Sequence, residues 1–482
     1  MNNKKLISSV IWSTGERVFS FLVSTIISVI LARLISPDDF GVLALVTVFV
    51  NVFSNVLLNG LGTALVQKKD VTQEDYSTIF IINIAIAIVS YLLLFFCAPA
   101  IASFYENESL TRVTRVISLI IPFTALSAIQ FSYLQKTYQF KKYCLVTIIC
   151  ITVSGIVGVL AALNNFGIWA LVLHHVTKQL IQTIAVLLIS GLKIKWTFSK
   201  ESAKRLVPYG LKSMITTFVN DLEANVRSLV IGKVYTSADL AFYNQGGNFP
   251  KIVITTINPA IGRVVFPTFS ELQDDLIAYK KALRRAITLN QFIIAPALAG
   301  LISVAYTFII TLYTDKWAQA VPYLQILAFA FILRPYENMC NYAIMGKGKS
   351  GIILFDMIVT KTVSFITMVI AVFLLKDIQM IAWGVVFTSV VGIVLFAIQV
   401  KKMFDYKYTE QVKDVFPTLM LCLMMYLAIQ FVSHFLPMGI ISLIIQVAVG
   451  VIIYVGVAYV LKFEAMQFII DTVKKKIKKG VA

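Results

Sequence analysis

Charged and amide side chains recur at helical spacing inside long apolar segments of this 482-residue sequence. In residues 206–234 they follow i, i+4, i+8, i+11 and i+15 spacing, which places them on one face of a helix. The members of this polar stripe are Lys212, Thr216, Asn220, Glu223 and Arg227. A charge at the centre of a bilayer costs about 2.5–3.5 kcal/mol on insertion scales, so the stripe must face a hydrated cavity or other charged side chains.

Three further apolar segments carry a similar polar face. They are residues 7–35 with Glu16 and Arg17, residues 40–64 with Asn51 and Asn55, and residues 244–266 with Asn248 and Lys251. Arg334 stands beside a predicted kink at Pro335, and Asp356 lies inside the next apolar segment. Because cations outnumber acids in this set, the pattern predicts a polar cavity for an anionic solute. The competing interpretation is that these side chains pair with one another and only set helix packing.

The elements that must position these residues are transmembrane helices. The sequence is 59% hydrophobic and 14% charged, with a mean hydropathy of +0.84. Apolar segments of about 20 residues follow one another along the chain, which predicts an all-α polytopic membrane protein with about 14 spans. The predicted spans are 7–35, 40–64, 77–102, 112–136, 143–163, 166–191, 206–234, 244–266, 285–312, 320–345, 350–375, 379–400, 414–434 and 439–461. The first is too long for a cleavable signal peptide.

Two turns share one pattern at an offset of 200 residues. The stretch LARLISPDDFG (31–41) contains Ser36 three residues before Asp39, and IGKVYTSADLAFY (231–243) contains Thr236 three residues before Asp239. Both have the form of a capping box that starts the second helix of a hairpin. The repeat predicts two pseudo-symmetric six-helix lobes, 1–200 and 201–405, followed by two helices and a basic tail in 406–482.

The remaining polar residues place the termini and exclude several kinds of site. Nearly all lysines and arginines in the connections fall on the side of the N-terminus, which predicts that both termini are cytoplasmic. The tail KKKIKK is then expected beside anionic lipid, with no nucleic acid bound. The five cysteines and three histidines form no metal-ligand pattern, and the motifs of hydrolases and nucleotide-binding proteins are absent, so no enzyme activity, metal or cofactor is predicted.

Three stretches carry a resemblance to a known family. LARLISPDDFGVLAL (31–45), YLQKTYQFKKYCLV (133–146) and NYAIMGKGKSGI (341–352) resemble the bacterial polysaccharide and O-antigen flippases of the multidrug/oligosaccharidyl-lipid/polysaccharide exporter superfamily. The resemblance implies two six-helix lobes that flip an undecaprenyl-pyrophosphate-linked oligosaccharide to the outer leaflet by alternating access. It also implies a bacterial cell (inner) membrane location and a role in surface polysaccharide biosynthesis, such as lipopolysaccharide or exopolysaccharide.

The resemblance assigns roles to the polar residues by their position in the lobes. The expected substrate-binding residues are Arg17, Lys212, Arg227, Lys251, Arg334, Asn51, Asn55 and Asn248. The candidates for H+ or Na+ coupling are Glu16, Glu223 and Asp356. Polysaccharide polymerase and chain-length proteins are expected partners. Two alternatives stay open: a multidrug and toxin extrusion antiporter, which the cationic surplus disfavours, and a membrane-embedded polymerase or ligase, which the short outward loops disfavour.

Overall fold

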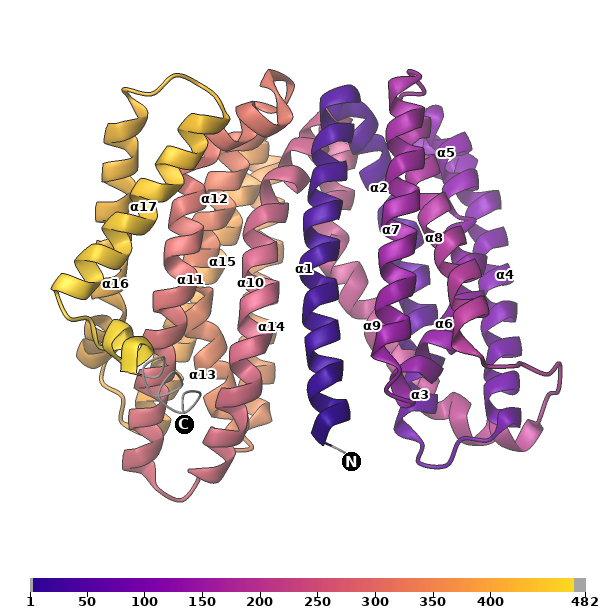
Figure 1. Cartoon of the computed structure of the whole chain (residues 1–482), viewed down its shortest axis with the longest axis horizontal. Coiled ribbons are helices and arrows are strands. Elements are labelled where there is room, and N and C mark those ends of the chain that lie inside the picture. The colour runs from indigo at the N-terminus through magenta and orange to yellow at the C-terminus, as the bar shows by residue number, and fades with distance from the viewer. Residues whose placement is uncertain (1–2, 472–482) are drawn as a thin grey trace. The chain divides into compact units, whose positions relative to one another are not determined.

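The fold is built from α-helices (Figure 1). The computed structural model describes residues 3–471, with side chains at Trp12, Gly15–Arg17 and from Phe19 onward. Within residues 3–471 there is no β-strand, and each of the predicted spans coincides with one helix or with two consecutive helices. The predicted all-α fold class is therefore confirmed. The basic tail KKKIKK lies outside the described residues.

The chain divides into two compact units, Met1–Ala241 and Phe242–Ala482, called here the first and second unit. The helices of the first unit are α1 (Asn3–Leu34), α2 (Pro37–Asn59), α3 (Leu61–Gln67), α4 (Gln73–Phe104), α5 (Ser109–Ile117), α6 (Ile120–Lys136), α7 (Phe140–Leu163), α8 (Ile168–Ser190) and α9 (Lys200–Val234). These units are defined by contacts, whereas the lobes were predicted from the 200-residue repeat. The lobe boundaries at residues 200 and 405 therefore stay a prediction.

Small residues let the helices of the first unit approach closely. A β-carbon on Gly210 of α9 would lie 2.4 Å from Leu61 Cδ2 of α3, and one on Gly232 would lie 2.2 Å from Leu45 Cδ2 of α2. Helices α2 and α3 thus pack along one side of α9, as small residues at helix interfaces allow.

A buried carboxylate ties α9 to the start of α4. Asp75, which is fully buried, accepts hydrogen bonds from Arg205 Nη2 (3.0 Å), from the backbone N–H of Thr72 (2.9 Å) and from Lys68. Thr72 Oγ1 in turn accepts from the N–H of Asp75, which completes a capping box for α4. A charge can be buried here because every partner of the carboxylate is supplied.

The second unit begins within α10 (Ser237–Glu271), whose first residues belong to the first unit. Its other elements are α11 (Leu276–Tyr313), the 3₁₀ turn η1 (Asp315–Trp317), α12 (Ala320–Ile332), α13 (Arg334–Gly346), α14 (Ser350–Ile370), the π-helical stretch η2 (Ala371–Leu375), α15 (Ile378–Phe404), α16 (Tyr408–Ser433) and α17 (Ile440–Val460).

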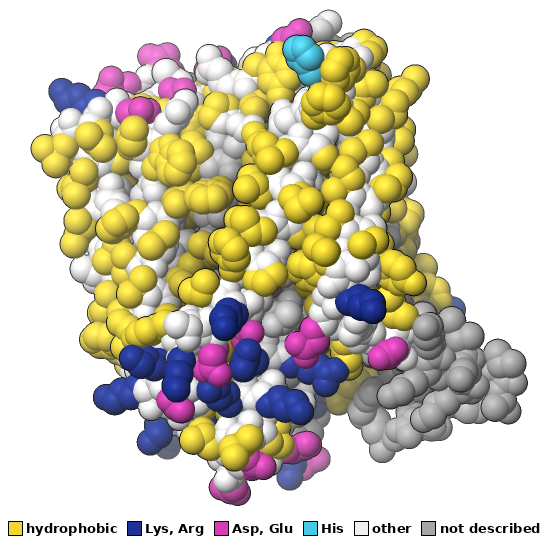
Figure 2. Space-filling view, turned by 90° about the vertical axis from the view of Figure 1, so that its left-hand side faces the viewer, with side chains coloured by type: hydrophobic (Ala, Val, Ile, Leu, Met, Phe, Trp, Pro, Cys, Tyr) yellow, Lys and Arg dark blue, Asp and Glu magenta, His cyan; other side chains and the backbone are white. Residues whose placement is uncertain are grey.

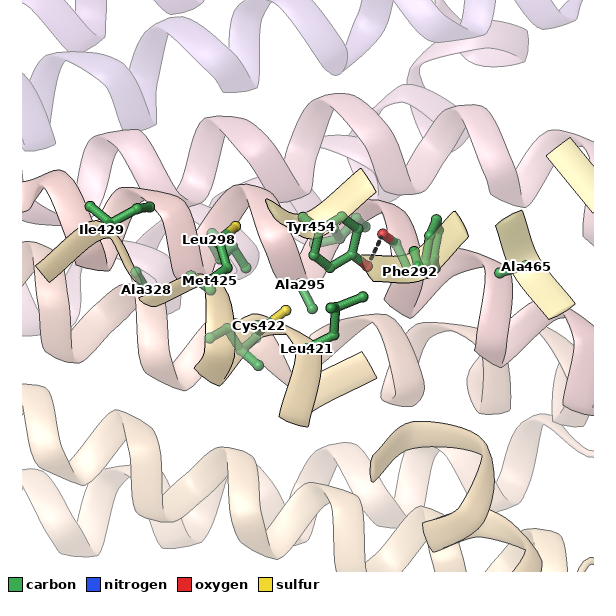
Figure 3. Close-up of a cluster of buried hydrophobic side chains, with 14 of the residues drawn as sticks. Phe292, Ala295, Leu298, Ala328, Leu421, Cys422, Met425, Ile429, Tyr454 and Ala465 are labelled. Atoms are coloured by element: carbon green, nitrogen blue, oxygen red, sulfur yellow. Dashed lines mark hydrogen bonds between the residues drawn. The ribbon is translucent and has the colours of Figure 1, made fainter. Parts of the chain in front are cut away.

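Helices α16 and α17 pack on α11 through a cluster of buried apolar side chains (Figure 3). Leu298 of α11 lies in this cluster with Met425 and Ile429 of α16. Tyr454 of α17 adds its ring, and its hydroxyl donates to the carbonyl oxygen of Phe292 at 2.8 Å. This bond satisfies the only polar atom of the tyrosine side chain. The last two helices therefore share the core of the second unit.

The surface has the pattern of a protein embedded in lipid. On the side of α16 and α17, hydrophobic side chains cover the middle of the face, and lysine and arginine side chains gather at one end (Figure 2). Twelve helical segments of the described chain are long and apolar enough to cross a membrane. The other two predicted spans are α9, which is rich in charge, and the α12–α13 pair, which is interrupted. The chain is a multi-pass membrane protein.

Both predicted helix caps are present. Ser36 Oγ accepts from the N–H of Asp39 at 3.3 Å and donates to Asp39 Oδ2 at 3.0 Å. Thr236 Oγ1 makes the same pair of bonds with Asp239, at 3.1 and 2.7 Å. In addition, the N–H of Thr236 donates to Asp239 Oδ2 at 3.2 Å. The aspartates therefore start α2 and α10, as the sequence predicted.

The basic residue before the second cap has a structural partner as well. Lys233 Nζ donates to the carbonyl oxygen of Phe104 at 2.7 Å and lies 2.8 Å from Glu106 Oε1, at the C-terminal end of α4. Lys233 Nζ also donates a hydrogen bond to Glu106 Oε1. This second hydrogen bond and the positive charge of Lys233 lower the pKa of Glu106 below its ordinary value. Lys233, in the last turn of α9, therefore caps the C-terminal end of α4.

Candidate substrate and coupling sites

The polar stripe of α9 forms as predicted, because α9 is a continuous helix. Lys212, Asn220 and Glu223 are exposed, and Arg227 is half-buried. On the other side of the helix, Met214 is buried against α2 and α3. The stripe therefore faces away from the packed side of α9 and can be hydrated.

Helices α1 and α2 place their predicted site residues in the same unit. Glu16 is half-buried and accepts a hydrogen bond from Ser20 Oγ at 2.9 Å, and Arg17 is exposed. On α2, Asn51 is exposed and Asn55 is half-buried. Seven of the predicted residues thus belong to the first unit: Glu16, Arg17, Asn51, Asn55, Lys212, Glu223 and Arg227.

The second unit holds the other four predicted residues, on three helices. Asn248 and Lys251 are exposed on α10. Arg334 is the first residue of α13, where its Nε lies 3.7 Å from Glu337 Oε2. Asp356 lies on α14 and is buried. Each unit therefore contributes both cations and a carboxylate to the predicted set.

Arg334 lies at a one-residue interruption between two helices, where the sequence predicted a kink. Helix α12 ends at Ile332, and Pro335 occupies the start of α13. Two amide side chains of α11 bind backbone carbonyl groups at the interruption: Gln291 Nε2 donates to that of Ile332 at 2.9 Å, and Asn290 Nδ2 donates to that of Pro335 at 3.2 Å. Such interruptions are tolerated in a membrane where neighbouring side chains satisfy the backbone.

Asp356 has the most unusual environment of the predicted residues. Its side chain is 2% exposed, and neither carboxylate oxygen has a hydrogen-bond partner among the described residues. Thr360 lies one turn after Asp356 on α14. Both Thr360 and Glu337 of α13 lie close to Gly392 of α15, because a β-carbon on Gly392 would be 2.6 Å from Glu337 Oε1 and 3.5 Å from Thr360 Cγ2. A buried carboxylate without a partner is expected to carry a proton or hold a cation.

The sequence interpretation missed two polar residues of the first unit. Lys178 is half-buried in the middle of α8 and makes no hydrogen bond or ion pair with the described residues. Gln130 of α6 is 1% exposed, and neither atom of its amide group has a partner there. A lysine ten residues into an apolar span was visible in the sequence. The burial of Gln130 was not, because it depends on how α6 packs.

No metal site accompanies these residues. Within the described part of the chain, no three His, Cys, Asp or Glu side chains come together as metal ligands. All five cysteines are free thiols. What the geometry offers is cationic and amide groups on polar helix faces and one isolated buried carboxylate, which suits binding and transport of a charged solute.

Comparison with known proteins identifies the family. Residues 30–322 match the family described as polysaccharide biosynthesis protein. The chain belongs to this family. The matched region covers α2 to α11, which includes both capped hairpin starts and the polar stripe of α9. The resemblance inferred from the sequence is thereby confirmed.

Relatives and solved structures agree with this membership. This polysaccharide biosynthesis protein is 27% identical to the succinoglycan biosynthesis transport protein ExoT of Rhizobium meliloti over 74% of the chain and 72% of ExoT. It is 24% identical to the lipopolysaccharide biosynthesis protein WzxC of Escherichia coli over 76% of the chain and 75% of WzxC. Its fold is similar to that of the lipid II flippase MurJ in an inward closed conformation, with a TM-score of 0.73, 15% identity and coverage of 94% of this chain and 98% of MurJ.

Proposed function

We propose that this protein flips undecaprenyl-pyrophosphate-linked oligosaccharide repeat units from the inner to the outer leaflet by alternating access, for surface polysaccharide biosynthesis. The observation that carries the proposal is the placement of cations on polar faces of membrane helices. The cations that would contact the pyrophosphate are Arg17, Lys212, Arg227, Lys251 and Arg334. Each charge-assisted hydrogen bond to a phosphate contributes about 1.5–3 kcal/mol.

The amide residues complete the proposed site. Asn51, Asn55 and Asn248 carry both hydrogen-bond donors and acceptors, which suit sugar hydroxyl groups. The family membership and the transport role named for ExoT support this assignment and speak against a polymerase or ligase. The expected partners are the lipid-linked oligosaccharide, and in the cell the polysaccharide polymerase and chain-length proteins.

Transport in liposomes tests the proposal directly. The purified protein is reconstituted with a fluorescent polyprenyl-pyrophosphate sugar, and the label that becomes accessible to a membrane-impermeant quencher on the opposite leaflet is measured over time. We expect faster redistribution than in protein-free liposomes. Uptake of a cationic drug with no movement of the lipid-linked sugar would support the multidrug antiporter and contradict the flippase.

Asp356 has the strongest structural support among the coupling candidates, which also include Glu16 and Glu223. Its carboxylate is buried and unpartnered, whereas Glu16 is already bonded to Ser20. We expect Asp356→Asn to abolish the stimulation of flipping by a pH or Na+ gradient while some flipping without a gradient remains. If Asp356→Asn responds to both gradients as the unmodified protein does, Asp356 is not the coupling residue.

The proposed location is the bacterial inner membrane with both termini in the cytoplasm. Residues 164–166 and 435–440 would then lie outside, and the helix ends near residues 281 and 402 inside. Single cysteines are placed at these four positions in a chain freed of its own cysteines, and labelling with a membrane-impermeant maleimide is measured on intact cells. Labelling near residue 281 or 402 from outside would overturn this topology.

A further inference from the structure

The second unit contains a cavity that the proposed transport does not use. It lies between the first turns of α14 and the last turns of α15 and has a volume of about 520 Å³. Its lining residues are Gly351, Ile352, Phe355, Gln399, Lys402 and Met403. Phe355 is 54% exposed, so the apolar wall opens to the surroundings of the protein.

The charge of the cavity is positive. Lys402 is exposed and has no hydrogen-bond or ion-pair partner among the described residues, and the lining contains no acidic side chain. The neighbouring lysine is engaged elsewhere, because Lys401 Nζ lies 4.4 Å from the centre of the Tyr408 ring. The cavity therefore offers one available ammonium group beside an amide, at the mouth of an apolar wall.

These properties select one class of ligand. A free phosphate ion would gain nothing from Ile352, Phe355 and Met403, whereas an acyl chain would bury them. A zwitterionic lipid such as phosphatidylcholine also has a phosphate, but its choline cation offsets that charge and would lie close to the ammonium group of Lys402. Basic pockets between transmembrane helices near the membrane surface bind anionic lipid headgroups. The size also lies in the range of ordinary ligand pockets, about 300–1,000 Å³.

We propose that the α14–α15 cavity binds an anionic glycerophospholipid, with its phosphate on Lys402 and Gln399 and its acyl chains on Ile352 and Phe355. This inference is independent of the transported substrate. The lipid would fill the space between α14 and α15 at this end. The packing of α14 against α15 would then depend on which lipids the surrounding leaflet contains.

A charge variant and a matched control test the headgroup contact. The full chain is purified in detergent, phosphatidylglycerol or phosphatidylcholine is added at equal concentration, and the lipid retained per protein is measured by native mass spectrometry. We expect preferential retention of phosphatidylglycerol by the unmodified protein, and at least a several-fold loss of that preference in Lys402→Gln. Lys401→Gln should keep the preference. Equal losses in both variants would mean that the lysines attract anionic lipid without a site.

A steric variant tests the cavity itself. Gly351 lines the cavity, and a β-carbon there would meet nothing within 4 Å, so Gly351→Trp adds a bulky side chain at the cavity wall without a clash at its first carbon. Gly456 of α17 has equally open surroundings and supplies the control Gly456→Trp. We expect only Gly351→Trp to lose the retained phosphatidylglycerol, with both variants unfolding at the same temperature. Unchanged retention in Gly351→Trp, or displacement of the lipid by inorganic phosphate alone, would overturn the proposal.

Discussion

A β-carbon on Gly41 would lie 1.7 Å from the carbonyl oxygen of Ser237. The first turn of α2 therefore rests directly on the backbone at the start of α10, so the two capped hairpin starts touch. The glycine of the DDFG stretch is needed because no larger residue leaves room for Ser237.

Replacement of Gly41 by alanine should destabilise the protein. The obstacle is backbone, which cannot move aside as a flexible side chain can, so we expect a cost in the range of overpacked sites, about 1–3 kcal/mol. The thermal unfolding temperature in detergent measures this cost. Gly15→Ala is the control, because a β-carbon there meets nothing within 4 Å. An equal unfolding temperature for Gly41→Ala and Gly15→Ala would contradict the close contact.

Variants of the first cap distinguish a structural role of Asp39 from a role in ion binding. Ser36→Ala combined with Asp39→Ala removes both bonds of the cap and should cost about 1–2 kcal/mol of stability. Asp39→Asn should cost little, because the amide oxygen can still accept from Ser36. Unfolding temperature and polysaccharide export are measured for both variants. If Asp39→Asn stops export at a normal protein level, Asp39 acts in gating or ion binding instead.

Hydropathy predicted where the helices lie but not where they break. The predicted span 40–64 is interrupted at Gly60, where a β-carbon would lie 2.1 Å from Met214 Cγ of α9. The predicted span 112–136 is likewise divided between α5 and α6. The break at Pro335 was predictable, because proline removes a donor and clashes with the preceding turn. The division between α5 and α6 lies just before Pro122 and was predictable for the same reason. The break at Gly60 coincides with the close approach of Met214, a tertiary contact that hydropathy does not report.

For the candidate site, the sequence likewise predicted which residues share a helix face but not which residues of other helices surround them. Helical spacing fixed which side of α9 carries Lys212 and Arg227, because that follows from geometry alone. The isolation of Asp356 could not be predicted, since it depends on which side chains α13 and α15 bring near it. The bonds from Asn290 and Gln291 to the α12–α13 break were equally hidden, although two adjacent amides inside an apolar span were a visible signal.

An ionic link between α11 and α16 should contribute measurably to stability. Arg284 holds Asp414 through two parallel bonds, Nε to Oδ2 at 2.7 Å and Nη2 to Oδ1 at 2.8 Å, and Tyr406 donates to the same carboxylate at 2.6 Å. Because Arg284 is 38% exposed, solvent weakens the pair, and we expect Arg284→Gln to cost about 1–2 kcal/mol. Unfolding temperature is the measurement, with the exposed Lys281→Gln as control. A matched loss in both variants would show that only net charge matters.

The stripe of α9 gives the sharpest test of the proposed substrate site. If Arg227 contacts the pyrophosphate, loss of one charge-assisted contact of about 1.5–3 kcal/mol should weaken substrate binding tenfold or more. Arg227→Lys keeps the charge but not the planar fork, so we expect partial export. Arg227→Gln alone is ambiguous, because it also changes the surroundings of Glu223 one turn away.

The double variant Glu223→Gln with Arg227→Gln removes this ambiguity, because it leaves no charge behind on that turn of α9. We expect it to fail in polysaccharide export, and Lys251→Gln to fail as well, each with a normal amount of folded protein in the membrane. Lys281→Gln should export normally, which shows that loss of a lysine is not harmful in itself. Full export in the double variant would mean that Glu223 and Arg227 serve only in helix packing, and the substrate site would then have to be sought on other helices.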